Sequence, residues 1–441
     1  MRRADVVDVT TSVQSGHVPA QRTRSRAAGA AAAIHDIIDN RRVRALFHPL
    51  VRLATREVVG YEALSRGPDG SPLETPMAML DAARAVGRLP ELDWTCRAAA
   101  AEAALKGPYD PSLALFVNLE PQTLGVDCPE HLRSVIAAAG DRFRIVAEFT
   151  ERALSRDPAV LLSAVAQVRA NGWGVALDDV GAEPASLALL PFVHPDVIKL
   201  DLRLVQDRTD GEVASIANAV RAHSERTGAA ILAEGIETPR HERVARVLGA
   251  TFAQGWLYGR PAALPTVPLH TDRPLPRLAV APVNRAQTPF DIVSEVRETA
   301  RVDKRLLLPM SHHVEDQSLV AGAGLVVLGC FQESRHFTEA TSLRYAALAK
   351  RAVFTAALAA GLPEEPADGV RGVALASGDR LRDEWTVIVV GAHVATALGA
   401  RDCGDTGSDG DRQFDFVITH DRDLVCSAAR AILAWISPAV I

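Results

Sequence analysis

The chain has 441 residues, of which 48% are hydrophobic and 23% charged, a composition that can bury a sizeable core and excludes broad disorder. Lys and Arg number 48 against 54 Asp and Glu, so the net charge of −6 does not favour a nucleic-acid polymer as partner. Five dispersed cysteines without a CxxC pair disfavour a disulfide scaffold. Because neither a membrane span nor a secretory signal is visible, we expect a cytoplasmic protein.

The chain opens with residues 1–28, which have no hydrophobic period and are predicted to form a disordered tail. An alanine-rich helix is expected at residues 30–42, in a first domain that we place at residues 29–264. Along this domain, short apolar runs end in polar residues and alternate with helical stretches. From Asn118 these polar ends follow at spacings of 30, 30, 23, 33 and 20 residues, at Glu148, Asp178, Asp201, Glu234 and Gln254.

Each spacing fits one strand, one helix and two loops. Continuous apolar runs of this kind indicate parallel strands covered by helices. With seven or eight such units, closure into a βα barrel is favoured over an open sheet, and the C-terminal strand ends then share one rim. That rim collects Glu62, Asn118, Glu148, Asp178, Asp179 and Glu234, with Lys199 and Asp201 beside them.

Five carboxylates and an amide on one rim repel one another unless cations bind or pKa values rise. Oxygen donors without cysteine favour Mg²⁺ or Mn²⁺ over zinc, and six donors are enough for two ions. Paired metals suit the in-line hydrolysis of a phosphoester. Any single member could instead cap a helix or form a buried ion pair, but six successive strand ends favour the metal site.

The rim residues belong to motifs that follow one another along the chain. These are YEALSR at 61–66, FVNL at 116–119, EFTE at 148–151, LDDVG at 177–181, IKLD at 198–201, AEGIET at 233–238 and QGWLYGRP at 254–261. In this order they resemble the EAL domain, the cyclic di-GMP phosphodiesterase family, over residues 41–263. The resemblance implies a modified TIM barrel that hydrolyses cyclic di-GMP to linear pGpG with two Mg²⁺ or Mn²⁺ ions, in second-messenger signalling.

The resemblance also implies a role for each matching residue. Lys199 would orient and polarise the attacking water, and Glu234 would hold a metal or its bound water. Gln254 would help to hold the site, and Glu151 would brace the loop after the Asp pair. Substrate contacts would come from Leu64, Arg66, Asp201, Gln254 and Arg260. The metal ligands would be Glu62, Asn118, Glu148, Asp178, Asp179 and Glu234.

One segment departs from the family pattern. After the Asp pair the family usually has a Phe-Gly-Thr-Gly-Tyr-Ser-Ser loop that links the metal site to a dimer contact, whereas this chain has VGAEPAS at residues 180–186. A proline stiffens this loop, so a homodimer through the barrel would need an atypical contact. A non-catalytic cyclic di-GMP receptor and a scaffold for a partner protein therefore stay open, although the intact ligand positions favour the enzyme. His48, where the family often has Gln, is interpreted as a packing or capping residue.

A proline-rich linker is predicted at residues 265–289, followed by a second domain at residues 290–441. Strands are expected at residues 323–331, 372–377, 385–393 and 414–419, and helices at 338–361 and 423–437. Motifs such as Phe331-Gln332, Glu384-Trp385 and His420-Asp421-Arg422 resemble the DICT domain over residues 285–435. This resemblance implies a smaller mixed α/β sensory domain with a regulatory role, whose signal or ligand is unknown.

Some residues of the second domain allow two interpretations. His420 and Asp421 could act as acid and base, but without a nucleophile motif a helix cap is favoured. His312 and His313 are interpreted as a loop pair, since no spaced partner completes a metal site. An aromatic set could line a ligand pocket or pack in the core, and it comprises Trp385 and the phenylalanines at 331, 337, 414 and 416.

Overall fold

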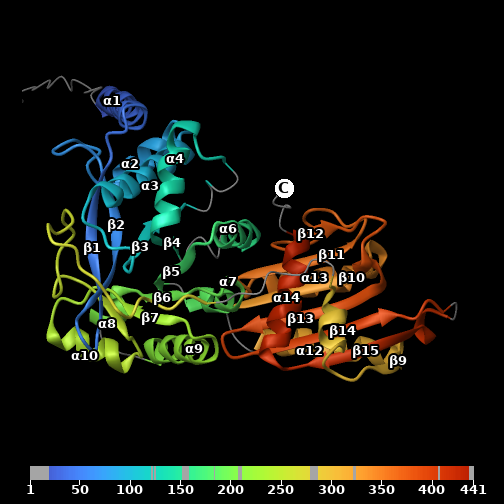
Figure 1. The fold of residues 1–441 in the computed structure, drawn as a ribbon. Coiled ribbons are helices and arrows are strands. Elements are labelled where there is room, and N and C mark those ends of the chain that lie inside the picture. The colour runs from blue at the N-terminus through green and yellow to red at the C-terminus, as the bar shows by residue number, and fades with distance from the viewer. Residues whose placement is uncertain are drawn as a thin grey trace, which may run out of the picture.

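Eight strands in the first part of the chain close into a barrel (Figure 1). The computed structural model describes residues 19–120, 123, 126–150, 158–182, 184–206, 211–278, 287–320, 324–405 and 408–436. In order around the barrel the strands are β1 (Arg44–Arg52), β2 (Val58–Arg66), β3 (Ala114–Asn118), β4 (Arg144–Thr150), β5 (Gly174–Val180), β6 (Val197–Leu200), β7 (Ala230–Ala233) and β8 (Phe252–Gln254).

The predicted barrel and its apolar strands are confirmed, with one exception in strand direction. Strand β1 pairs antiparallel with both β2 and β8, whereas all other neighbours are parallel. The few residues between Arg52 and Val58 allow a hairpin but are too few for the crossover that a parallel pair requires. Residues 44–52 are not among the apolar runs from which parallel strands are expected, so β1 is an antiparallel addition to the predicted barrel.

Helices cover the outside of the barrel. They are α1 (Pro19–Asp39), α2 (Pro76–Ala85), α3 (Leu89–Lys106), α4 (Glu130–Arg142), α6 (Pro158–Ala170), α7 (Leu190–Val193), α8 (Leu202–Gln206), α9 (Gly211–Thr227) and α10 (Pro239–Val247), with the 3-10 helix η2 (Pro184–Leu189) before α7. None of the helices in the described part of the chain combines the length and apolar composition that crossing a membrane requires.

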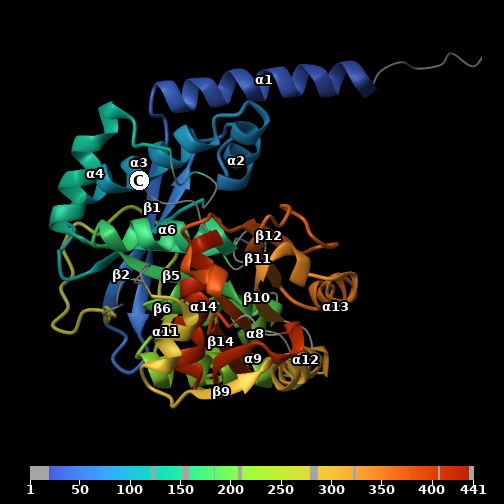
Figure 2. The ribbon, with the colours of Figure 1, turned by 90° about the vertical axis from the view of Figure 1, so that its right-hand side faces the viewer.

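The first helix lies beside α2 and α3 (Figure 2). Because α1 begins at Pro19, the prediction of a disordered tail over residues 1–28 is wrong from residue 19 onward, and residues 1–18 lie outside the described part. Ile34, Ile37 and Ile38 of α1 pack with Met79 and Leu92 in a small separate core. This contact ties the helix to the barrel's outer layer.

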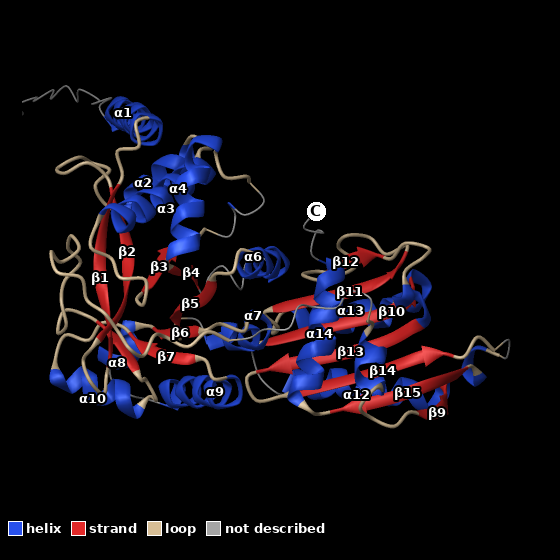
Figure 3. Ribbon diagram, viewed as in Figure 1, coloured by secondary structure: helices blue, strands red, loops and turns tan. Residues whose placement is uncertain are grey.

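The second domain is a seven-stranded sheet with helices on both faces (Figure 3). Its strand order is β12-β11-β10-β13-β14-β15-β9. The strands are β9 (Ala300–Asp303), β10 (Leu325–Glu333), β11 (Phe354–Ala360), β12 (Arg371–Ala374), β13 (Glu384–Gly391), β14 (Ala395–Asp402) and β15 (Gln413–Thr419). The helices are α11 (Pro289–Ser294), α12 (Lys304–Val320), α13 (Glu339–Ala349) and α14 (Arg422–Ile436), with short 3-10 turns η3 (Ser334–His336), η4 (Arg380–Asp383) and η5 (Asp409–Asp411).

Three expectations for this domain need correction. The helix predicted over residues 338–361 ends at Ala349, and its second half is strand β11, paired in parallel with β10. Strand β14 was not expected, because its small residues carry no clear apolar alternation. His312 and His313 lie within α12 rather than in a loop. Asp421, by contrast, accepts hydrogen bonds from the backbone N–H of Asp423 and Leu424, which confirms the predicted helix cap.

The two domains share a continuous apolar core. Alternate residues of β10 face opposite sides of the sheet, and Val326 and Leu328 join the same cluster as Leu187 and Leu189 from the barrel. Neighbouring Val327 belongs instead to a second cluster with α12 and α13. The barrel segment η2 packs directly against β10 and β13. Burial of apolar surface therefore joins the domains.

The proline-rich segment between the domains lies against the barrel end opposite the C-terminal strand ends. Leu275, which is 3% exposed, completes the cluster that fills the barrel interior. Arg144 at the start of β4 donates a hydrogen bond to the Leu275 carbonyl over 2.8 Å, and Asp196 accepts one from the Leu278 N–H over 2.6 Å. The described part of this segment thus plugs the barrel.

Replacing the plug should weaken the barrel. Leu275→Ala removes a buried side chain and is expected to lower the free energy of unfolding by about 2–5 kcal/mol. Leu269→Ala, in the same segment but 39% exposed, is the matched control and should change it by about 0.5 kcal/mol or less. Urea denaturation measures both, and equal losses would contradict the plug.

Candidate functional site

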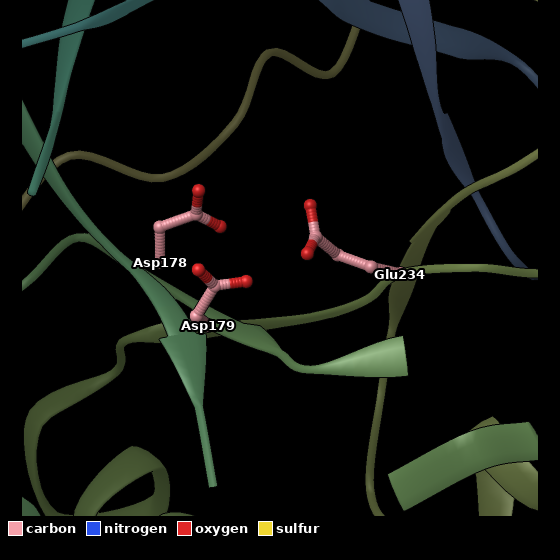
Figure 4. Close-up of side chains that lie close together, drawn as sticks. All are labelled: Asp178, Asp179 and Glu234. Carbon is pink, nitrogen blue, oxygen red and sulfur yellow. The ribbon is translucent and has the colours of Figure 1, made fainter. Parts of the chain in front are cut away.

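The C-terminal ends of the barrel strands bring the predicted rim residues together. Glu62, Asn118 and Glu148 come from β2, β3 and β4, and Lys199 comes from β6. Asn118 and Glu148 are register partners across the β3–β4 ladder. Asp178 and Asp179 lie in β5 just before its last residue, Val180, and Glu234 directly follows β7. Figure 4 shows these three carboxylates pointing toward one another.

Lys199 is the centre of the site. Its side chain is 0% exposed, and its Nζ lies 2.7 Å from Glu148 Oε1 and 2.9 Å from Asp178 Oδ1. The same Nζ is 2.9 Å from Glu234 Oε1 and 3.8 Å from Glu62 Oε2. One ammonium therefore contacts carboxylates from four different strand ends.

Two amides fix the position of Glu62. Gln254 on β8 donates from Nε2 to Glu62 Oε2 over 2.8 Å, and Asn118 donates from Nδ2 to Glu62 Oε1 over 3.3 Å. Burial disfavours the charged form of Glu62, but Lys199 and these two amides outweigh it and lower the pKa of Glu62. Glu62 is thus held as a carboxylate.

The pKa values of the other buried groups at the rim are raised rather than lowered. Burial raises the pKa of Glu148 well above its ordinary value. Burial, followed by the charge of Asp178, raises the pKa of Glu234 to about 8. Burial disfavours a charged Lys199, yet the surrounding carboxylates, Asp178 foremost, hold its pKa well above the ordinary value. More negative charge is gathered here than one lysine neutralises.

A bulge in β5 gives the site two adjacent carboxylates. Consecutive residues of a regular strand point to opposite faces. The β5–β6 register shifts between Leu177 and Val180, and Asp179 adopts a left-handed backbone with φ of 57°. Aspartate tolerates this conformation better than most residues. As a result, carboxylate oxygens of Asp178, Asp179 and Glu234 lie within 4.8 Å of one another.

These residues fit divalent metal ions. The donors are carboxylate and amide oxygens, the ligands that Mg²⁺ and Mn²⁺ prefer. Glu148 Oε2 is buried and accepts no hydrogen bond from any residue that the structure describes. A buried acceptor of this kind is costly unless a cation or water reaches it. The rim therefore has both the charge and an open acceptor for a cation.

Apart from Gln254 on β8, the predicted substrate-contact residues lie on β2 or follow β6 and β8, three of the strands that carry the rim residues. Arg66 ends β2 beside partly buried Leu64 and donates from Nη1 to the Ser65 carbonyl. Asp201 Oδ1 accepts from Arg203 N over 2.8 Å, which caps α8. The Arg260 guanidinium lies 3.9 Å from the centre of the Trp256 ring. Glu151 falls outside the described residues, so its bracing role stays a prediction.

Sequence reasoning missed two supports of the site. Asp93 on α3 accepts from the Glu120 N–H over 3.4 Å and from Thr123 Oγ1 over 2.7 Å, so it anchors the loop after Asn118. Arg97, four residues along the same helix, pairs with Asp93 over 2.6 Å. The i, i+4 spacing of Asp93 and Arg97 was the available signal.

His48, interpreted as a packing or capping residue, lies opposite Glu62 in the β1–β2 register.

Removing the central ammonium should destabilise the metal-free protein. Lys199→Met leaves several buried carboxylates without their cation, and the free energy of unfolding is expected to fall by about 3–5 kcal/mol. Lys106→Met is the matched control, because that side chain is 78% exposed. Urea unfolding in a chelator measures both variants, and equal stability of wild type and Lys199→Met would refute the central role.

Comparison with known proteins places this geometry in a family. The family model of the EAL domain matches residues 31–261, more than half of the chain. A second model, described as a sensory domain in diguanylate cyclases and two-component systems (DICT), matches residues 291–402. Both resemblances drawn from the sequence are therefore confirmed.

Relatives share the barrel part. A protein of Escherichia coli named probable cyclic di-GMP phosphodiesterase PdeB is 30% identical over 53% of this chain and 45% of its own length. An uncharacterized signaling protein of Caulobacter vibrioides is 30% identical over 55% of this chain and 30% of its own. The chain thus spans less than half the length of these curated relatives.

Among solved structures, similarity is found to Klebsiella pneumoniae BlrP1 in a manganese and cyclic di-GMP complex. It is 28% identical, has a TM-score of 0.45, and the match covers 50% of this chain and 56% of that chain. The PaMucR phosphodiesterase in a cyclic di-GMP complex is 24% identical, has a TM-score of 0.46, and the match covers 53% of this chain and 97% of that chain. On the family match over residues 31–261, the chain belongs to the EAL domain family.

Proposed function

We propose that the barrel hydrolyses cyclic di-GMP to linear pGpG with Mg²⁺ or Mn²⁺. The observation that carries the proposal is the set of four carboxylates gathered around buried Lys199 at the strand ends. Membership of the EAL domain family and a relative named as a probable cyclic di-GMP phosphodiesterase support it. The predicted ligand positions are all present.

The residues divide into three tasks. Bound metal ions would supply an activated water and neutralise charge on the phosphate. Lys199 would orient that water, because its ammonium lies within 2.9 Å of carboxylates from β4, β5 and the end of β7. Gln254 would keep Glu62 in place. Leu64, Arg66, Asp201 and Arg260 would contact the nucleotide, and the metals would be held by Glu62, Asn118, Glu148, Asp178, Asp179 and Glu234.

Reduced cysteines support a reducing compartment for this reaction. All five cysteines are free: Cys96, Cys128, Cys330, Cys403 and Cys426. Disulfides are rare where cytosolic reductants act. We therefore propose a cytoplasmic setting, with the barrel at residues 29–264 and the sensory domain at residues 290–441.

Loss of one ligand should abolish turnover. In full-length protein with Mn²⁺, Glu62→Gln is expected to lower the rate of pGpG formation by about 100-fold or more, since it removes a negative ligand while keeping side-chain volume. Glu57→Gln, in the turn between β1 and β2 at the other end of the barrel, is the control and should leave the rate unchanged. Nucleotide analysis by chromatography measures both.

A second candidate function is a receptor that binds cyclic di-GMP without hydrolysing it. The segment after Asp179 supports this candidate, because its sequence departs from the family pattern and η2 packs against β10 and β13 of the second domain. Binding of cyclic di-GMP by wild type without any pGpG in Mg²⁺ or Mn²⁺ would establish the receptor and contradict the enzyme. Absence of both binding and turnover would favour the scaffold.

We also propose that the sensory domain regulates the barrel through a direct contact. Only a few residues separate Asp179 from η2, which packs against β10 and β13. Across the same interface, Arg430 on α14 donates from Nη2 to His194 Nε2 over 2.9 Å, and Arg226 pairs with Asp423 over 3.2 Å. Burial and the charge of Arg430 lower the pKa of His194 to about 4, so the imidazole is a neutral acceptor.

Disturbing this contact should change turnover. Arg430→Gln is expected to alter the rate of hydrolysis by about fivefold or more, in either direction, while Glu62 and its partners stay intact. Arg371→Gln, on exposed β12 away from the interface, is the matched control. Equal rates for both variants and wild type would contradict regulation through this interface.

A further inference from the structure

The sensory domain contains a cavity of about 360 Å³. It lies on the sheet face covered by α12 and α13, whereas the barrel packs on the opposite face, with Leu187 and Leu189 in the core there. A cavity of this size is in the range of small-molecule sites. We propose that it binds a planar aromatic carboxylate. This inference goes beyond the phosphodiesterase proposal and does not depend on it.

Aromatic rings form the apolar walls. Phe331 and Phe414 are buried and line the cavity together with Trp385. The rings of Trp385 and Phe414 are 6.2 Å apart and nearly perpendicular, at 82°. Flat walls that meet at an angle complement a flat ring, which can stack on one wall and meet the edge of the other.

One lining side chain carries a hydrogen-bond donor without an acceptor. Trp385 Nε1 is buried, and no described residue accepts its proton. Buried indole N–H groups usually find a partner, so an unpaired one beside a cavity calls for an acceptor from a ligand. A carboxylate or ring oxygen would supply that acceptor.

The backbone beside the cavity is locally strained. Strand β10 has a register shift between Cys330 and Glu333, and Gln332 in this bulge has a φ of 64°. Gln332 also lines the cavity. Left-handed conformations of non-glycine residues and β-bulges gather at functional sites, where they redirect side chains. The bulge therefore points to the same place as the unpaired donor.

Cationic groups at the cavity select an anion. The cavity is lined by three cations, Lys304, Arg335 and Arg344, and by two acids, Asp409 and Glu315. Burial lowers the pKa of two further lining residues, His312 and His336, which are therefore neutral at pH 7. Arg344 and Lys304 already pair with Glu315 and Asp409.

Arg335 is the cation best placed to exchange its partner. It pairs with Glu333, with side chains 72% and 44% exposed, and such exposed pairs contribute little stability. Arg335 can therefore turn to a ligand carboxylate, which guanidinium binds in a bidentate geometry.

Calorimetric titration of the full-length protein tests the proposal. The probes are 4-hydroxybenzoate and indole-3-acetate, each with a twin that lacks the carboxylate, phenol and 3-methylindole. At least one acid should bind with a saturable one-site isotherm, about tenfold or more tighter than its twin. Absence of saturable binding by both acids in the millimolar range, or equal binding of acid and twin, would overturn the assignment.

Two substitutions locate the binding. Trp385→Phe removes the N–H and replaces the indole by a smaller aromatic ring, and Arg335→Gln removes an exposed cation; each should weaken binding by about tenfold. Arg371→Gln is the matched control and should bind like wild type. Because Arg335 is exposed, Arg335→Gln keeps the fold even if Trp385→Phe loses stability. Wild-type affinity in Arg335→Gln and in folded Trp385→Phe would place the ligand elsewhere and overturn the proposal.

Discussion

The buried ammonium of Lys199 is the interaction on which the rim of the barrel depends. Carboxylates that approach from β2, β4, β5 and β7 would repel one another in a low-dielectric interior. Lys199 contacts all four, while the amides of Asn118 and Gln254 fix Glu62. Because one lysine does not neutralise the set, the same arrangement that stabilises the rim leaves room for divalent cations.

The second constraint is the shared core of the two domains. The segment that follows Asp179 continues into η2, whose Leu187 and Leu189 pack with Val326 and Leu328 of the sensory sheet. A shift of that sheet would therefore displace residues close to Asp178 and Asp179, the aspartates proposed to bind metal, since packed cores transmit displacement. The cavity under α12 and α13 lies on the other face of the same β10 strand, which connects the proposed ligand site to the barrel through a single element.

Much of the barrel could be predicted from the sequence, because apolar runs that end in carboxylates mark both the strands and the rim. The direction of β1 depends on a short hairpin, which the apolar pattern does not reveal. Residues 354–360 read as helix because alanine has a high helix propensity, but pairing with β10 overrides it. The left-handed backbone of Asp179 depends on tertiary packing, so no local sequence pattern indicates it. The i, i+4 spacing of Asp93 and Arg97 indicates their ion pair, but the contacts of Asp93 with the loop after Asn118 also depend on tertiary packing.

Anomalous diffraction from crystals of the full-length protein grown with Mn²⁺ tests the central claim most directly. The account predicts manganese peaks between the rim carboxylates. Asp178, Asp179 or Glu234 would contact the metal on one side, and Glu62 or Glu148 on the other. Lys199 would move away from at least one of its four carboxylate partners. Crystals in saturating Mn²⁺ that show no peak at the rim, with Lys199 still contacting all four carboxylates, would contradict it.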